Sequence, residues 1–171
     1  MVARTTALTV LALAAAAACA RGEAAVSTLD VGQAVPREWT EAAPRDQGLS
    51  LVWVFRTDDC LTCQAADYPL RQVQARFGDQ VPLVAVHVGA EADSTIPNAF
   101  MRTRRLRTAE RFTVSPRAFR RAHGDAALPT VVLVKGDTIV WTSTIRAGNA
   151  GAGPVELDTV VNHWMRKAPP R

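Results

Sequence analysis

Two continuous apolar runs, with a stretch of helical character between them, constrain the fold of this 171-residue chain most strongly. The first run is Leu49–Phe55 and the second is Pro82–Val88. Runs without polar alternation are typical of strands that are covered on both faces of a sheet. Strand, helix and strand within about 40 residues form a βαβ unit, so we expect these two strands to be parallel.

The helix between the two runs is expected to start at Asp58-Asp59-Cys60 and to continue towards Phe77. Pro69 should kink it, because proline removes one intrahelical hydrogen bond. Further helices are expected at 36–39, 96–107, 116–123 and 155–167, and further strands at 111–114, 130–135 and 138–144. This order predicts an α/β domain, with a central mixed β-sheet flanked by helices on both faces.

Cys60 and Cys63 form a Cys-x-x-Cys motif at the junction of the first strand and this helix. Backbone N–H groups at a helix N-terminus favour the thiolate form of a cysteine there. The second cysteine follows one turn later, near enough to close a small disulfide. One thiol can therefore attack a substrate disulfide while the other resolves the mixed disulfide. Within a βαβ unit, this spacing is typical of a thioredoxin-like redox motif.

A second signal is the step Leu128-Pro129-Thr130, directly before the strand of a hairpin. A proline in this position can be cis, which places the neighbouring backbone beside the disulfide. Together with the Cys-x-x-Cys motif and the order of elements, the step predicts a cis peptide bond before Pro129.

Four segments carry a resemblance to a known family: LVWVFRTDDCLTCQ, VPLVAVHVG, FTVSPRAFRRAHG and ALPTVVLVKGDTIVW. They resemble the thioredoxin-like superfamily, and within it the TlpA/ResA-like thiol–disulfide oxidoreductases of the bacterial envelope. The resemblance implies a thioredoxin-like domain over residues 48–168, with no cofactor. It implies that Cys60 is the nucleophile, Cys63 the resolving thiol and Pro129 the cis-proline. The implied partners are protein disulfide or dithiol substrates and a redox protein that recharges the pair.

Three positions depart from the pattern of that family. Asp59 replaces the usual aromatic residue before the first cysteine, and Leu61-Thr62 lacks the usual proline. The usual glutamate three residues after the second cysteine is Ala66, and Asp67 follows one place late. We expect the residues that support the cysteine pair to be Asp58, Asp59, Asp67 and Thr130.

Charges near Cys60 act in opposite directions. The helix N-terminus and Arg56 favour its thiolate, whereas Asp58 and Asp59 oppose it by like-charge repulsion. We therefore expect a less acidic thiol than in strong oxidases, and a reductant or an isomerase-like poise.

Residues 1–20 have the layout of a secretory signal peptide: a basic head with Arg4, an apolar stretch and small residues. The stretch before Cys19 resembles a lipobox, in which Cys19 becomes the lipidated first residue. Alternatively, an ordinary signal peptidase cleaves before Arg21. We favour the lipoprotein interpretation, with a tether and lead-in segment over residues 21–47. It places the protein in the cell envelope, lipid-anchored on the periplasmic face; the alternative is a soluble periplasmic or secreted protein.

Two other classes of function remain open for the same cysteines. One is a copper or zinc metallochaperone, in which His87 or His123 joins the two thiolates. We expect no metal, because His87 lies within an apolar strand and His123 is expected to be a C-terminal capping group. The other is a non-catalytic binding module with a static disulfide. A peroxiredoxin is disfavoured, because Trp53 stands where that family has a proline.

The formal net charge of +4 is too small to indicate nucleic acid as a partner. The basic residues are nevertheless concentrated: the segment 100–122 holds eight arginines and one glutamate. This segment is either a solvated helical face or a docking surface for an acidic partner or anionic lipid headgroups.

Overall fold

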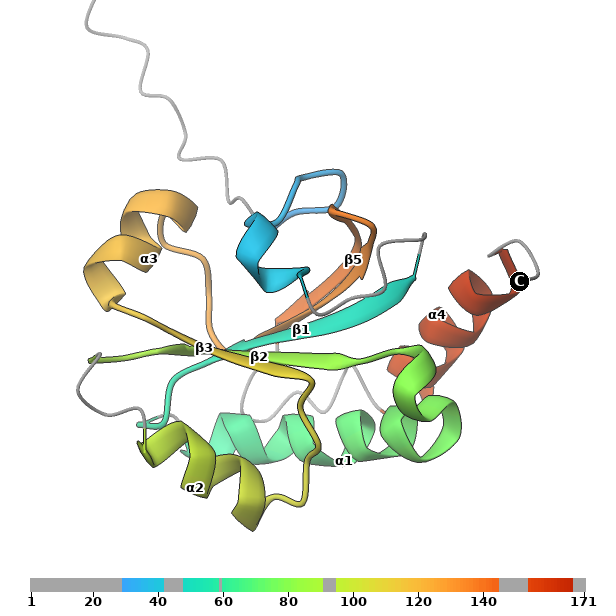
Figure 1. The fold of residues 1–171 in the computed structure, drawn as a ribbon, viewed down its shortest axis with the longest axis horizontal. Coiled ribbons are helices and arrows are strands. Elements are labelled where there is room, and N and C mark those ends of the chain that lie inside the picture. The colour runs from blue at the N-terminus through green and yellow to red at the C-terminus, as the bar shows by residue number, and fades with distance from the viewer. Residues whose placement is uncertain (1–28, 42–47, 59, 91–94, 145–153, 168–171) are drawn as a thin grey trace, which may run out of the picture.

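The computed structural model describes residues 29–41, 48–58, 60–90, 95–144 and 154–167. A five-stranded mixed sheet runs through its centre in the order β3-β2-β1-β4-β5 (Figure 1). The first three strands are mutually parallel, and β4 and β5 are antiparallel additions. The expected sheet and its parallel βαβ pair are therefore confirmed. The strands are β1 (Leu49–Phe55), β2 (Leu83–Val88), β3 (Glu110–Val114), β4 (Thr130–Lys135) and β5 (Thr138–Thr144).

Helices cover both faces of the sheet, as expected. Figure 1 shows α1 and α2 on one face, and α3 with the short helix η1 on the other. Helix α4 packs against α1. None of the helices in the described ranges is both long enough and apolar enough to cross a bilayer. The helices are η1 (Arg37–Trp39), α1 (Cys60–Phe77), η2 (Gly78–Gln80), α2 (Thr95–Thr103), α3 (Pro116–His123) and α4 (Pro154–Lys167).

Strand β1 is the structural centre, and all of its residues are buried. Side chains alternate along a strand, so Trp53 and Phe55 face α1 while Val52 and Val54 face α3. Burial on both faces explains why the sequence of this strand is continuously apolar. It also fixes the position of its C-terminal end, from which the chain leads into α1.

Helix α2 is shorter than the sequence predicted, because it ends at Thr103 instead of continuing to residue 107. Arg105 adopts a left-handed backbone with φ of 56°. The N–H of Leu106 bonds the carbonyl of Met101 at 3.2 Å, and the N–H of Arg105 bonds Arg102 at 3.0 Å. This is the Schellman arrangement that ends a helix. It turns Leu106 into the core, and that burial outweighs the local preference of the arginines for helix.

Residues 29–40, part of the segment predicted as tether and lead-in, lie against the hairpin of β4 and β5. The N–H of Val35 bonds the carbonyl of Asp137, and the N–H of Ile139 bonds the carbonyl of Gln33, both at 2.8 Å. Trp39 is only 2% exposed. This part of the segment therefore belongs to the packed domain.

His123 lies in the last turn of α3, but its ring does not face solvent as a charged capping group would. It is buried between Trp39, at 5.1 Å between ring centroids, and Phe119, at 4.8 Å. Burial lowers the pKa of His123, and the carboxylate of Glu38 opposes this effect only in part. Apolar packing against η1 thus favours the neutral imidazole over the cation that a helix C-terminus would favour.

We predict that His123→Gln flattens the pH dependence of stability on the acid side of pH 6.5, the ordinary pKa of histidine. Because the folded-state pKa of His123 is lowered, the unfolded chain binds more protons, and stability falls as the pH drops below 6.5. Urea unfolding at several pH values between 5 and 8 measures this slope. The exposed His163 provides the control, and His163→Gln should leave the slope unchanged. An unchanged slope in His123→Gln would contradict the prediction.

Candidate active site

The Cys-x-x-Cys motif lies where β1 ends and α1 begins. Helix α1 starts at Cys60, so both cysteines belong to its first turn and a half. The Cys63 side chain is fully buried, and its S–H donates to the main-chain carbonyl of Arg56 at 3.3 Å. Asp59 and the side chains of residues 60–62 lie outside what the structure describes. The structure thus places Cys63 against the chain segment that leaves β1.

The peptide bond between Leu128 and Pro129 is cis, which confirms the prediction. Thr130, the first residue of β4, pairs with Val54 in the antiparallel register. One step further along this register, Pro129 lies beside Phe55 at the end of β1. The segment that leaves β1 therefore bonds Cys63 through the carbonyl of Arg56, and the cis-Pro129 turn is its neighbour in the sheet.

Thr130 fixes the turn that carries Pro129. Its side chain is buried, and its hydroxyl donates to the carbonyl of Ala127 at 2.6 Å. The same oxygen lies 3.2 Å from the hydroxyl of Thr144 on β5. Thr130, expected as a supporting residue, thus connects the proline turn to the edge of the sheet.

Arg56 and Asp58 pair with each other on the surface beside α1. The Arg56 guanidinium donates from Nε to Oδ1 of Asp58 at 3.0 Å, and a second bond completes the fork. Both side chains are largely exposed. This pairing partly cancels the charges of Arg56 and Asp58, two of the three charged groups that the sequence places near Cys60.

Asp67 is buried one helical turn after Cys63, at the i+4 position of α1. Residues with this spacing lie on the same face of a helix. Its carboxylate pairs with Arg104, which follows α2, and their side chains are only 12% and 10% exposed. Burial raises the pKa of Asp67, whereas Arg104 and, more weakly, Arg71 lower it. Asp67 thus lies on the face of α1 that carries Cys63, with its carboxylate directed to Arg104.

Arg104 is the partner that the sequence did not reveal. Its guanidinium carbon lies 4.0 Å from the centroid of the Phe100 ring, and its main-chain carbonyl accepts a bond from Arg71 at 3.2 Å. Phe100 in turn stacks on Phe55 with centroids 5.1 Å apart. Arg104 is one of eight arginines in the segment 100–122, and nothing in the sequence distinguishes it from the other seven. Only the packing of α2 against α1 selects Arg104.

His87 is buried in the core at the end of β2, as its apolar strand indicated. His87 lies beside Phe55 in the register of the parallel strands β1 and β2, and the centroids of their two rings are 5.6 Å apart. Its Nε2 lies 3.5 Å from the hydroxyl of Thr57. The described residues hold no cluster of three or more His, Cys, Asp or Glu side chains that could bind a metal.

We predict that Gly89→Ala destabilises the fold by about 1–3 kcal/mol, the usual penalty for overpacking a core. An added Cβ at Gly89 would lie 2.2 Å from Cε1 of His87, and the buried ring cannot move aside freely. Urea unfolding measures the change. The same substitution in a His87→Ala background should be much milder, because the obstructing ring is absent. Equal penalties in both backgrounds would show that the contact with His87 is not the cause.

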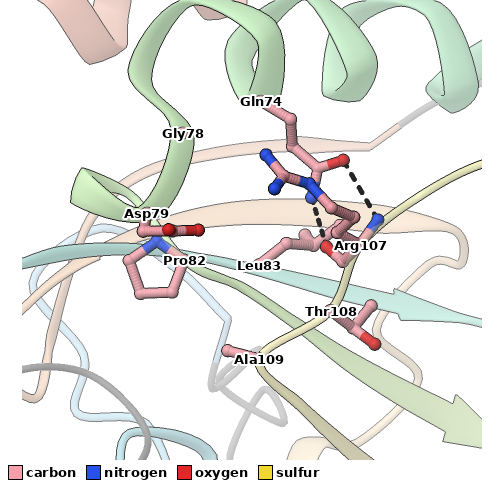
Figure 2. A pocket seen from close by; sticks show the side chains of 8 residues that line it. All are labelled: Gln74, Gly78, Asp79, Pro82, Leu83, Arg107, Thr108 and Ala109. Carbon is pink, nitrogen blue, oxygen red and sulfur yellow. Dashed lines mark hydrogen bonds between the residues drawn. The ribbon is translucent and has the colours of Figure 1, made fainter.

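A hollow of about 310 Å³ lies elsewhere, between the end of α1 and the start of β3 (Figure 2). The side-chain amide of Gln74 bonds both the N–H and the carbonyl of Arg107 across it. Its wall includes Leu83, the first residue of β2, whereas Cys63 lies at the opposite end of the parallel strands. The hollow therefore takes no part in the cysteine site.

No family model matches the chain, and no curated protein matches it. Solved structures, in contrast, do match this chain. A thioredoxin-like protein from Parabacteroides distasonis matches with a TM-score of 0.58 and 10% identity, over 78% of this chain and 96% of the other. A putative thiol:disulfide interchange protein DsbE from Chlorobium tepidum matches with a TM-score of 0.54 and 15% identity, over 77% and 96%.

A third match is an uncharacterized thioredoxin-like protein from Porphyromonas gingivalis, with a TM-score of 0.55 and 20% identity over 72% of this chain and 79% of the other. Identities this low establish a shared fold. The chain therefore has the thioredoxin-like fold, and its structural neighbours include thiol:disulfide interchange proteins.

Proposed function

We propose that the protein is a thiol–disulfide oxidoreductase that uses Cys60 and Cys63 as its redox pair. One observation carries the proposal: the Cys-x-x-Cys motif begins the helix that follows the central strand, and the cis-Pro129 turn flanks the same strand end. Thiol:disulfide interchange proteins among the structural neighbours support it.

In the reductive direction, the Cys60 thiolate attacks one sulfur of a substrate disulfide and displaces the other as a thiolate. Cys63 then loses its proton and attacks Cys60 in the mixed disulfide. This step forms the Cys60–Cys63 disulfide and releases the second substrate thiol. The protein loses two electrons and the substrate gains two. A second redox protein reverses the change, so no cofactor is needed.

The division of labour follows from position on α1. Cys60, at the helix N-terminus, lies nearest to the unsatisfied N–H groups that stabilise a thiolate. Cys63 lies deeper, where its S–H is held by the carbonyl of Arg56. Pro129 and Thr130 form the flank against which a substrate chain lies, and Asp67 with Arg104 sets the charge near Cys63.

The reduction potential of the Cys60–Cys63 pair tests the proposal. Asp58 and Asp59 oppose the thiolate form of Cys60. We therefore expect a reduction potential between those of thioredoxin and protein disulfide isomerase, about −270 to −180 mV. Equilibration with glutathione buffers followed by alkylation measures it. A value near the −120 mV of strong oxidases would reverse the assigned direction. A disulfide that exchanges with no thiol would indicate the static binding module.

We further propose that Cys19 is lipidated and anchors the protein to the envelope, facing the periplasm. The support is the lipobox-like sequence before Cys19. Cys19→Ala should release the protein from the membrane fraction or block its maturation. Unchanged fractionation of this variant would leave ordinary secretion as the explanation of the signal peptide.

A further inference from the structure

The outward side of α3 is an arginine face, formed by Arg117, Arg120 and Arg121. Their spacing of i, i+3 and i+4 places them together on one side of the helix. The opposite side carries the buried residues Phe119 and His123. The three arginines, with Pro116, line a hollow of about 490 Å³.

The positive charge of this face is poorly compensated within the described part of the chain. Arg117 and Arg121 make no ion pair with a described residue. Arg120 lies 3.6 Å from Asp125, but the two side chains are 78% and 95% exposed. Ion pairs so exposed contribute little. The arginine face therefore presents nearly its full charge to solvent.

Other arginines of the same segment are used inside the fold. Arg104 pairs with Asp67, and Arg111 donates to the side chains of Thr108 and Asn98, both at 2.6 Å. The structure thus separates two roles that the sequence left mixed. Arg104 and Arg111 connect elements of the fold, whereas Arg117 and Arg121 on α3 are exposed and make no ion pair with a described residue.

The arginine face begins at the end of the parallel strands from which β1 leads into α1, on the face of the sheet opposite to α1. Helix α3 follows β3, whose last residue Val114 pairs with Val88 at the end of β2 (Figure 1). Strand β3 is two positions from β1 in the sheet, and neighbouring strands are about 5 Å apart. The chain therefore passes from β3 into α3 about 10 Å from the end of β1. The other end of α3 leads within a few residues to Pro129.

We propose that the arginine face of α3 docks an acidic segment of the protein substrate whose disulfide exchanges with Cys60 and Cys63. The inference rests on the proposed redox function and adds the class of substrate. Guanidinium groups bind carboxylates with two parallel hydrogen bonds, and uncompensated positive charge beside a site steers an acidic chain towards it. An acidic segment in the substrate chain itself would bring its disulfide towards the cysteines, whereas a lipid headgroup carries no disulfide, so a protein chain is the favoured occupant.

The test uses three cysteine peptides, each as a mixed disulfide with thionitrobenzoate. They differ only in a run of four identical residues placed a few positions from the cysteine. This run is Glu in the first peptide, Ser in the second and Lys in the third. The reduced protein attacks the disulfide and releases one thiol, and Cys63 then releases the other by forming the Cys60–Cys63 disulfide. Release of coloured thionitrobenzoate gives the rate constant, and the leaving group is identical in all three peptides.

We expect the Glu peptide to react about tenfold or more faster than the Lys peptide at low ionic strength, and the difference to shrink with added salt. Arg117→Glu/Arg121→Glu should abolish the preference, and Arg117→Gln/Arg121→Gln should reduce it. The matched control is Arg166→Glu/Lys167→Glu, with the same change in net charge at the end of α4. Trp164 of α4 contacts Lys135, at the opposite end of the sheet from the cysteines. This control should keep the preference.

A second measurement separates the two proposals. Fluorescence anisotropy of a labelled, cysteine-free Glu peptide reports docking alone. Docking that depends on Arg117 and Arg121, without thionitrobenzoate release from any peptide, would overturn the redox function and keep the docking surface. Equal release rates from the three peptides, with no docking, would overturn the inference and keep the redox function. Binding of anionic phosphatidylglycerol vesicles through the same arginines, without peptide preference, would also overturn it in favour of lipid.

Discussion

Arg104→Ala is expected to lower the free energy of unfolding by about 3 kcal/mol, the scale seen when one partner of a buried ion pair is removed. The loss arises because the Asp67 carboxylate stays buried without its cation. The contact of the guanidinium with the Phe100 ring is lost as well. Urea unfolding at pH 7 measures the change. Arg102→Ala, an exposed position on α2, is the matched control and should change stability by less than about 0.5 kcal/mol.

The pH dependence identifies the cause of this loss. The pKa of Asp67 is raised by burial even with Arg104 present, and removal of the cation raises it further. A carboxyl with a raised folded-state pKa favours the fold when protonated, so its unfavourable effect grows as the pH rises through that pKa. The penalty of Arg104→Ala should therefore be smaller at pH 4 than at pH 7.

Replacing both partners removes the uncompensated charge altogether. Asp67→Leu/Arg104→Met should recover most of the stability, because apolar pairs often replace buried ion pairs without loss. A double variant as unstable as Arg104→Ala would show that packing of the arginine stem, and not its charge, holds α2 on α1.

The second large effect concerns the two cysteines. Cys60→Ser should reduce insulin-disulfide reduction to the rate without protein, because the remaining thiol of the motif, Cys63, is fully buried. Cys63→Ser should also lose turnover but should accumulate mixed disulfides, since the nucleophile remains and the resolving thiol is absent. Non-reducing electrophoresis of envelope extracts separates the two outcomes.

The third cysteine supplies the control for these variants. Cys19→Ser makes the same chemical change far from the motif in sequence, and the purified variant should retain full turnover of insulin disulfides. Trapping by Cys60→Ser instead of Cys63→Ser would exchange the assigned roles. The absence of trapping in both variants, with wild-type turnover intact, would show that another group carries the attack.

Much of the fold follows from local pattern. The apolar runs of β1 and β2, the Ser115 cap of α3 and the turn at Gly136 are signals that act over a few residues. Ser115 accepts a bond from the N–H of Ala118 at 3.2 Å, as an N-cap should. The cis bond before Pro129 was also predictable, because motif and element order indicated it together.

The parts that escaped prediction depend on contacts between distant segments. Helix α2 ends early because the core takes in Leu106, and His123 turns inward because Trp39 arrives from the N-terminal segment. Arg104 meets Asp67 across 37 positions of sequence, and no spacing rule selects it from its neighbours. Local propensity is a weak guide where tertiary packing decides.

The N-terminal segment against β5 also bears on solubility. An uncovered edge strand offers free N–H and C=O groups to the edge of another molecule and thereby promotes aggregation. Here Ala34 forms a bridge with Thr138, and Gln33 accepts the N–H of Ile139. Residues 29–40 thus occupy part of the hydrogen-bonding edge of β5 that a second sheet could otherwise extend. A chain shortened to begin at Gly48 would keep both cysteines but expose that edge, and with it a route to sheet-to-sheet association.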